Sequence, residues 1–161
     1  NQGSSIFFLA GLVSTPNAKK NIIRTVTIPH THAIFFPVGA MLQDPFISGT
    51  SNTDTMKAKL TYFLGHDVNN IGVKLDGAPI VTSDNIGLYR FANFDAFTYN
   101  IPENNIYTYI NKGVSAGIVT PAFAYGFYLM LGPLVPGPHD LTFNALIGTE
   151  VKSVTYKITS N

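Results

Sequence analysis

The sequence predicts an all-β protein, a two-sheet sandwich (Ig-like or jelly-roll-like) with one short helix near residues 54–64. Apolar runs rich in β-branched and aromatic residues recur about every ten residues, as in sandwiches and barrels. Clusters of Gly, Pro, Asn and Asp separate these runs, and such clusters are typical of turns. The length of 161 residues is that of one domain, so we expect a single β-sandwich domain over residues 1–161.

Three apolar runs open the chain: SIFFLAGLV (5–13), NIIRTVTI (21–28) and AIFFPVG (33–39). Each has the length of a strand and is rich in Ile, Val and Phe, which are enriched in strands. In the second run Arg24 shares a face with Ile22, so we expect Arg24 to point inward and to bind a carboxylate or a carbonyl. A structural ion pair is the preferred interpretation, and recognition of an anionic ligand is the alternative.

One segment, NTDTMKAKLTYFLGHD (52–67), departs from the strand pattern. Met56 and Leu60 recur at helical spacing, and lysines lie on the other side of the predicted helix. Asp54 or Thr53 is a suitable N-cap residue. We therefore expect a short helix here that covers an end or an edge of the sandwich.

The remaining chain alternates between predicted strands and turns. Asp76-Gly77 is a hairpin turn signal. Val154, Tyr156 and Ile158 alternate with polar residues, which indicates a strand with one buried and one solvated face. The strands expected in this part are residues 70–77, 87–93, 95–101, 105–111, 123–131, 139–147 and 150–159.

Charge is sparse: 12% of the residues are charged, and the formal net charge is +1. Apart from the adjacent Lys19 and Lys20, the lysines and arginines are scattered singly, so we expect no nucleic-acid partner. No apolar run reaches the roughly 20 residues of a membrane helix, so we expect no membrane span. A surface with little charge suits packing against copies of the same chain, which predicts a homo-oligomer or a polymer.

Six stretches stand in a characteristic order: SIFFLAG, RTVTIP, AIFFPVG, VKLDGAPI, YRFANFDAFTYNIPENNIY and AYGFYLMLGPLVPGPHDLTF. They resemble a family of uncharacterised secreted bacterial proteins with the patterns R-T-x-T-V-P-x-G-K-A-I-F-F-P and L-S-P-G-E-H-T-I-x-F. The resemblance spans residues 5–156. It implies a single-domain β-sandwich that is secreted or at the cell surface, its signal peptide removed, and it implies no activity. This chain has Val26 where family members carry a cysteine, and Pro138 where they carry the glutamate.

The stretch TVTIPHTHAIFFPV places His30 and His32 on either side of one threonine. These histidines are candidates for a metal site, but such a site needs further ligands. His66 and His139 are the other histidines, and nothing in the sequence places them nearby. In the family pattern residues 29–32 form a hairpin turn, which is the preferred interpretation. We therefore expect no metal and no cofactor.

Catalytic motifs are not found. The chain has no cysteine, which excludes thiol catalysis and disulfides. It contains no G-x-S-x-G elbow, no H-E-x-x-H helix and no phosphate-binding glycine loop. We expect no enzymatic activity.

Two sets of apolar residues are candidate contact sites. The first strand can add to the sheet of a neighbouring subunit, or it can lie in its own sheet. Exposed tyrosines stack on sugars and are enriched at protein interfaces, whereas others belong to the core. The candidate subunit interface is Ile6, Phe7, Phe8 and Leu9, and the candidate ligand or interface aromatics are Tyr99, Tyr107, Tyr109, Tyr125 and Tyr128.

Three functions are compatible with the sequence. The leading hypothesis is an extracellular structural protein that assembles by strand addition, as a subunit of a filament, a pilus or a surface layer. The alternative is a secreted module that binds glycans or another ligand through its tyrosines. A metal-dependent enzyme built around His30 and His32 ranks third.

Overall fold

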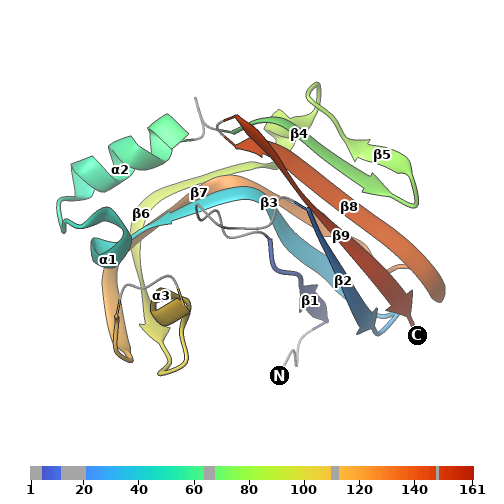
Figure 1. The fold of residues 1–161 in the computed structure, drawn as a ribbon, viewed down its shortest axis with the longest axis horizontal. Helices are drawn as coiled ribbons and strands as arrows, with labels where there is room; N and C mark the ends of the chain where they lie inside the picture. Colours follow the sequence, from blue (N-terminus) through green and yellow to red (C-terminus); the bar gives the residue numbers. More distant parts are fainter. Residues whose placement is uncertain (1–4, 12–20, 64–67, 110–112, 148) are drawn as a thin grey trace. The chain divides into compact units, whose positions relative to one another are not determined.

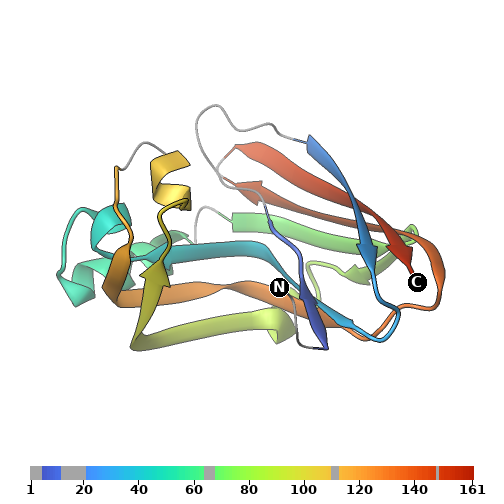
Figure 2. The same ribbon diagram turned by 90° about the horizontal axis from the view of Figure 1, so that it is seen from below.

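The protein is a β-sandwich of two mixed sheets, which confirms the predicted fold class (Figure 1). The four-stranded sheet has the order β1-β3-β7-β6, and the five-stranded sheet has the order β2-β9-β8-β4-β5. Strands β1 and β6 lie at the two edges of the four-stranded sheet (Figure 2). The computed structural model describes residues 5–11, 21–63, 68–109, 113–147 and 149–161, with the backbone alone for residues 68, 69, 93, 109 and 147.

Strands account for most of the described chain, and the helices are short. The strands are β1 (Ile6–Phe8), β2 (Asn21–Ile28), β3 (Ala33–Gln43), β4 (Val68–Leu75), β5 (Ala78–Val81), β6 (Arg90–Ile101), β7 (Gly117–Leu131), β8 (Gly137–Ile147) and β9 (Glu150–Ser160). The helices are α1 (Pro45–Ser48), α2 (Thr53–Tyr62), the 3₁₀-helix η2 (Ile86–Tyr89) and α3 (Ile106–Tyr109).

Three predicted features of the sandwich are confirmed. Strand β2 begins and ends where the sequence predicts, and β8 and β9 agree within two residues. The turn between β4 and β5 is formed by Asp76 and Gly77, whose φ angles are 52° and 81°. Two positive φ angles are the signature of the hairpin turn that Asp-Gly favours.

The core of the sandwich is formed by side chains of both sheets. Phe36 on β3 stacks on Phe143 of β8 with the ring centroids 5.0 Å apart, and Phe143 stacks on Tyr156 of β9 at 6.1 Å. Aromatic pairs at these separations add stabilisation beyond the burial of their area. The buried core residues are Leu9, Ile28, Ile34, Phe36, Val73, Val81, Leu129, Leu141, Phe143, Val154, Tyr156 and Ile158.

The connection between β2 and β3 is not the hairpin that the sequence suggested. Strand β2 pairs in parallel with β9 in the five-stranded sheet, whereas β3 belongs to the four-stranded sheet. His30 and His32 therefore lie in a tight connection that passes from one sheet to the other. A hairpin and a crossover have the same local turn chemistry, and strand pairing elsewhere in the chain decides between them.

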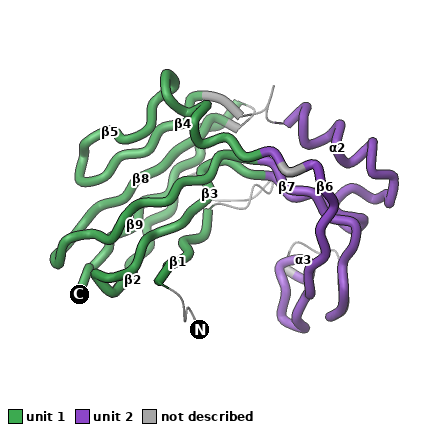
Figure 3. The backbone as a smooth tube through the Cα atoms, turned by 180° about the vertical axis from the view of Figure 1, so that it is seen from behind, with its two compact units in different colours: residues 1–40, 66–91, 126–161 green, residues 41–65, 92–125 purple. Residues whose placement is uncertain are grey.

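The chain divides into two compact units, which Figure 3 shows in different colours. Unit 1 holds residues 1–40, 66–91 and 126–161, and it contains the core described above. Unit 2 holds residues 41–65 and 92–125. The prediction of one domain over residues 1–161 stays a prediction.

Unit 2 contains the predicted helix and one element that the sequence misassigned. Helix α2 begins after Asn52, whose side chain accepts a hydrogen bond from the backbone N–H of Thr55 at 2.8 Å. Asn52, rather than Thr53 or Asp54, is thus the cap.

The strand predicted over residues 105–111 is wrong, because residues 106–109 form helix α3. The side chain of Asn105 accepts from the backbone N–H groups of Tyr107 and Thr108 and so begins that helix.

Gly126 marks a close approach of two backbone segments in unit 1. A Cβ atom on Gly126 would lie 2.7 Å from the Cα of Ala40 and 2.8 Å from the carbonyl oxygen of Gly39. We predict that Gly126→Ala lowers the free energy of unfolding by about 1–3 kcal/mol, because the clashing atoms are backbone atoms that cannot rotate away. Chemical denaturation measures the loss. Gly87→Ala is the matched control, since its Cβ would have no neighbour within 4 Å, and equal effects of both variants would contradict the packing described here.

Candidate functional site

Four aromatic rings, one from each strand, cross the outer face of the four-stranded sheet in unit 1. Phe8 on β1 contacts Phe35 on β3 edge to face, with the ring centroids 5.7 Å apart. Phe35 stacks on Tyr128 of β7 at 5.8 Å, and Phe91 on β6 meets Tyr128 at 6.1 Å and 85°. We call Phe8, Phe35, Tyr128 and Phe91 the aromatic row.

The position of these rings follows from the alternation of side chains along each strand. On β3, Ile34 and Phe36 are fully buried in the core, so Phe35 between them points to the other face. On β7, Leu129 and Leu131 pack into the core, so Tyr128 points outward. The same core contacts that hold the two sheets together therefore place the aromatic row on the outside.

The row is partly open to solvent. Phe8 is 55% exposed and Phe91 is 52% exposed, while the neighbouring Leu88 is 84% exposed. Burial raises the pKa of the Tyr128 hydroxyl at the centre of the row. A pocket of about 420 Å³ opens over the row and is lined by Phe35, Leu88, Tyr89, Arg90, Phe91 and Tyr128. This surface suits contact with another apolar or planar surface.

The predicted tyrosine patch is not one surface. Tyr128 belongs to the aromatic row, but Tyr107 and Tyr125 are only 2% exposed. The assignment of these two residues to a ligand or interface surface is therefore corrected, because their rings fill the interior of unit 2. Tyr99 is half-buried, and the side chain of Tyr109 lies outside the described part of the structure.

Asp44 binds the hydroxyls of Tyr99 and Tyr107 within unit 2. Its buried carboxylate accepts hydrogen bonds from the backbone N–H groups of Phe46 and Ile47 at 2.7 and 2.9 Å. The second oxygen accepts from the hydroxyls of Tyr99, at 2.8 Å, and of Tyr107. Burial, reinforced by the bond to Asp44, raises the pKa of Tyr107, and burial raises the pKa of Tyr99 to about 12.

This carboxylate is therefore saturated by protein donors, and the cluster reads as structural. Each of the two Asp44 carboxylate oxygens accepts two hydrogen bonds, so no acceptor position on this carboxylate remains for a ligand. The neighbouring Gln43 is also buried, and its Oε1 has no hydrogen-bond partner among the described residues.

The predicted interface strand lies in its own sheet. Strand β1 pairs in parallel with β3, and Phe8 is opposite Phe35. Leu9 is buried and Phe7 packs against the same core. Phe7 and Leu9 thus pack in the chain's own sandwich, which corrects their assignment to a subunit interface. Ile6 is partly exposed and shares its face of β1 with Phe8, which is exposed, and the assignment of these two residues stays a prediction.

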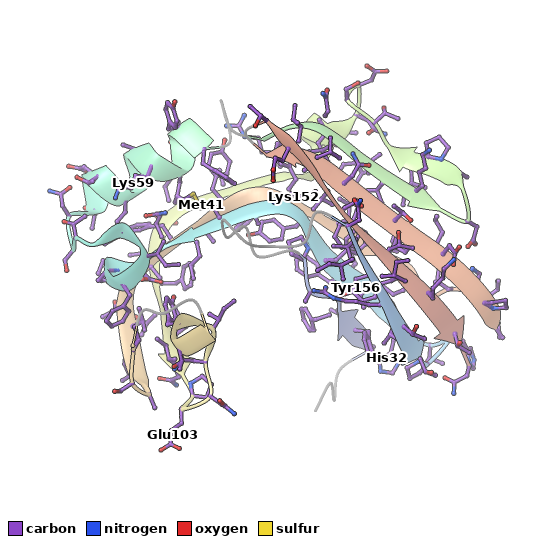
Figure 4. All side chains as sticks on the ribbon, in the orientation of Figure 1. His32, Met41, Lys59, Glu103, Lys152 and Tyr156 are labelled. Carbon is purple, nitrogen blue, oxygen red and sulfur yellow. The ribbon has the colours of Figure 1, made fainter. Side chains whose placement is uncertain are left out.

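Of the two candidate metal ligands, His30 is hydrogen-bonded to Asn161. The backbone N–H of His30 donates to the carbonyl oxygen of Asn161 at 2.6 Å, and its Nδ1 lies 2.8 Å from the same oxygen. The Nδ1 of His32, the residue labelled in Figure 4, lies 3.2 Å from the hydroxyl of Thr31. Within the described ranges, no group of three or more His, Cys, Asp or Glu residues is placed to hold a metal ion.

Arg24 points inward, as predicted, but it forms no ion pair with any residue that the structure describes. Its Nη1 donates to the carbonyl oxygens of Ala10 and Gly11 at 2.5 and 3.2 Å, and to the hydroxyl of Tyr156 at 2.7 Å. The guanidinium also lies over the Tyr156 ring, 5.5 Å from its centroid. Arg24 therefore ties the segment after β1 to β2 and β9.

His139 and Asp76 form a pair that sequence reasoning missed. Asp76 Oδ2 lies 2.7 Å from His139 Nδ1, and the carbonyl oxygen of Val135 lies 2.9 Å from His139 Nε2. Both ring nitrogens face oxygen acceptors, an arrangement that only the doubly protonated imidazolium satisfies. The register of β4 and β8, which pairs Leu75 with Leu141, brings the two residues together.

Comparisons with known proteins add no functional argument. No model of a known protein family matches the chain, and no curated protein matches it. Among solved structures, the chain is similar to one from a structure of PbICP-C in complex with falcipain-2. The two share 9% sequence identity with a TM-score of 0.34, over 98% of this chain and 100% of that chain. Across the described residues, no helix is long and apolar enough to cross a membrane.

Tyr107→Phe tests the Asp44 cluster. Removing the Tyr107 hydroxyl takes a hydrogen bond from a buried carboxylate, so we predict a loss of about 1–3 kcal/mol in the free energy of unfolding. Denaturant titration measures the loss. Tyr62→Phe is the control, because the Tyr62 side chain is 59% exposed. A Tyr107→Phe variant as stable as the native protein would contradict the role given to Asp44.

The His139–Asp76 pair predicts a pH profile of stability. Hydrogen bonding to Asp76, and then to Val135, raises the pKa of His139 above its ordinary 6.5. The bonds from His139 and from the Asp140 N–H lower the pKa of Asp76 below 3.8. The contribution of His139 to the stability of the folded protein is complete below pH 6.5 and is lost as the pH rises through its raised pKa. The contribution of Asp76 is complete above pH 3.8 and is lost as the pH falls through its lowered pKa.

Thermal unfolding of the native protein and of His139→Gln across this pH range measures the effect. We expect the difference in melting temperature to be largest between pH 3.8 and 6.5 and to shrink on both sides. Its size is small, because exposed ion pairs contribute only about 0–1 kcal/mol. His30→Gln, in the exposed turn, is the control. A difference that does not vary with pH would contradict the paired imidazolium.

Proposed function

We propose that this protein is an exported, non-catalytic β-sandwich that associates with copies of itself through the aromatic row. The open row on the outer face of the four-stranded sheet is the observation that supports this proposal. Soluble monomers rarely leave a contiguous apolar patch in water unless the patch binds something. The extracellular setting, as a subunit of a filament or surface layer, rests on the sequence resemblance and is part of the proposal.

A second copy is the partner that the charge pattern favours. The chain carries ten basic and nine acidic residues, and its formal net charge is +1. Copies of such a chain approach one another without long-range repulsion. Interfaces between identical subunits are enriched in aromatic residues and depleted of charge at their centre, and the row meets both conditions, with Arg90 as the charged residue among those lining its pocket.

The expected strength of this contact is low. Full burial of a Phe side chain is worth about 1.5–3 kcal/mol, so covering a half-exposed ring gains roughly 1 kcal/mol. Phe8 and Phe91 of two copies together contribute about 4 kcal/mol. Association costs about 4–15 kcal/mol in lost translational and rotational freedom. Burial of these rings alone therefore only approaches the lower end of that cost. Leu88 and Met130, both exposed beside the row, must join the contact, and the resulting association is weak and concentration-dependent.

Glycan binding is the second candidate function. Aromatic rings stack on the apolar faces of sugars, and the pocket over the row includes the polar side chains of Arg90, Tyr89 and Tyr128. Binding of free oligosaccharides that Phe91→Ser abolishes, by a protein that stays monomeric, would favour this function over self-association.

The double variant Leu88→Ser and Phe91→Ser tests the proposal. Light scattering coupled to size-exclusion chromatography, over a range of loading concentrations, reports the mass of the native protein and of the variant. We expect the native mass to rise above the monomer mass of 17.5 kDa with concentration, and the mass of the variant to rise less at every concentration. Ile23→Ser is the matched control, because Ile23 is 73% exposed on the other sheet. A native protein that is monomeric at every concentration would contradict the proposal.

A further inference from the structure

Strand β6 forms an exposed edge of the four-stranded sheet. Among the described strands, β7 is its neighbour on one side and none lies on the other. Within unit 2, β6 runs over residues 92–101 and shows an unusual exposure: Ala92, Phe94, Asp95, Ala96, Thr98 and Asn100 are all exposed. Both faces of this strand are accessible over residues 94–96, whereas Phe97 and Tyr99, on the same face as Asp95, are half-buried.

The other edge strands carry features that discourage pairing. Strand β1 has three residues, and β5 has four, one of which is Pro79. Strand β2 has the inward-pointing Arg24, which is bound to Ala10 and Gly11. Short edges, proline and inward charges are the devices by which sheets avoid adding strands. Residues 91–101 contain no proline, lysine or arginine, and Asp95 is their one charged residue.

We infer that residues 92–100 of β6 pair antiparallel with the same residues of a second copy. This inference rests on the proposed self-association and gives it a second contact surface. A two-fold axis perpendicular to the sheet leaves each side chain on the same side of the sheet in both copies. The residue numbers of two directly opposed residues must therefore differ by an even number. An axis at Ala96 pairs the whole exposed segment symmetrically.

The side chains favour this register. An axis at Ala96 places two small methyl groups opposite each other, Phe94 opposite Thr98 of the second copy and Asp95 opposite Phe97 of the second copy. An axis at Asp95 would instead oppose two carboxylates at the short cross-strand spacing, which is destabilising. Main-chain hydrogen bonds along the edge supply the affinity, and repulsion between the two copies of Asp95 excludes the register with its axis at Asp95.

Two different self-complementary surfaces have a consequence for assembly. A single two-fold contact is used up when a dimer forms. A subunit with two such contacts, the aromatic row in unit 1 and the β6 edge in unit 2, keeps one surface available after each pairing. Association then continues into a polymer. Each subunit in the polymer is held by both weak contacts, so it is bound more tightly than by either contact alone.

The absence of cysteine from the chain makes a direct test feasible. We expect Ala96→Cys to form a disulfide-linked dimer under mild oxidation, because opposed Cα atoms in an antiparallel pair lie about 4.5–5.5 Å apart. Asn100→Cys is the matched control on the same exposed face. In the proposed register its copies lie eight residues apart along the strand, or about 26 Å, so it should not cross-link. Non-reducing electrophoresis measures both.

The outcomes separate this inference from the proposed function. If the native protein self-associates but Ala96→Cys and Asn100→Cys cross-link equally or not at all, the β6 pairing is overturned and the aromatic row stands. If the native protein is monomeric at all concentrations, the proposed function fails first. A second variant, Ala96→Lys, places like charges opposite each other at the axis. It should fold, since Ala96 is exposed, and stop assembly at dimers; unchanged polymers would also overturn the pairing.

Discussion

The register of β3 is the constraint on which both the core and the candidate site depend. Phe36 must lie in the core, where it stacks on Phe143, and Phe35 must then lie on the opposite face. A slip of one residue would bury Phe35 and expose Phe36, which would dismantle the core and the aromatic row together. Strand β1 follows the same register, because Phe8 is opposite Phe35 and Leu9 enters the core. The outer surface is therefore fixed by inner packing.

Local patterns in the sequence predicted the elements whose environment is simple. Val154, Tyr156 and Ile158 alternate with solvated residues on β9, and Met56 and Leu60 mark the buried side of α2. The failures concern long-range pairing. Nothing near His30 shows that β2 pairs with β9, more than a hundred residues later in the chain, so the local sequence predicts a hairpin where the chain crosses between the sheets. The sequence predicts a strand in place of helix α3 because the aromatic residues of this segment have high strand propensity, which the Asn105 cap overrides.

The candidate site was only partly predictable for the same reason. Tyr107 leaves the surface because its hydroxyl binds Asp44, which is 63 residues away in the sequence. The aromatic row takes one ring from each of four strands, in an order that differs from the order of the chain. Phe8 and Tyr128 were named from the sequence, but Phe35 and Phe91 join them only through strand pairing. Outward-facing aromatics on neighbouring strands are a signal that requires the sheet order first.

The accessibility of individual side chains in dilute and concentrated solution tests the role of the aromatic row most directly. Hydroxyl-radical footprinting with mass spectrometry reads this accessibility residue by residue. We predict that Phe8, Leu88 and Phe91 are oxidised in dilute protein and protected in concentrated protein. Ile23 and Val151, exposed on the five-stranded sheet, should be oxidised equally in both. Protection of Ile23 and Val151 with continued oxidation of Phe8 and Phe91 would contradict the role of the aromatic row in self-association.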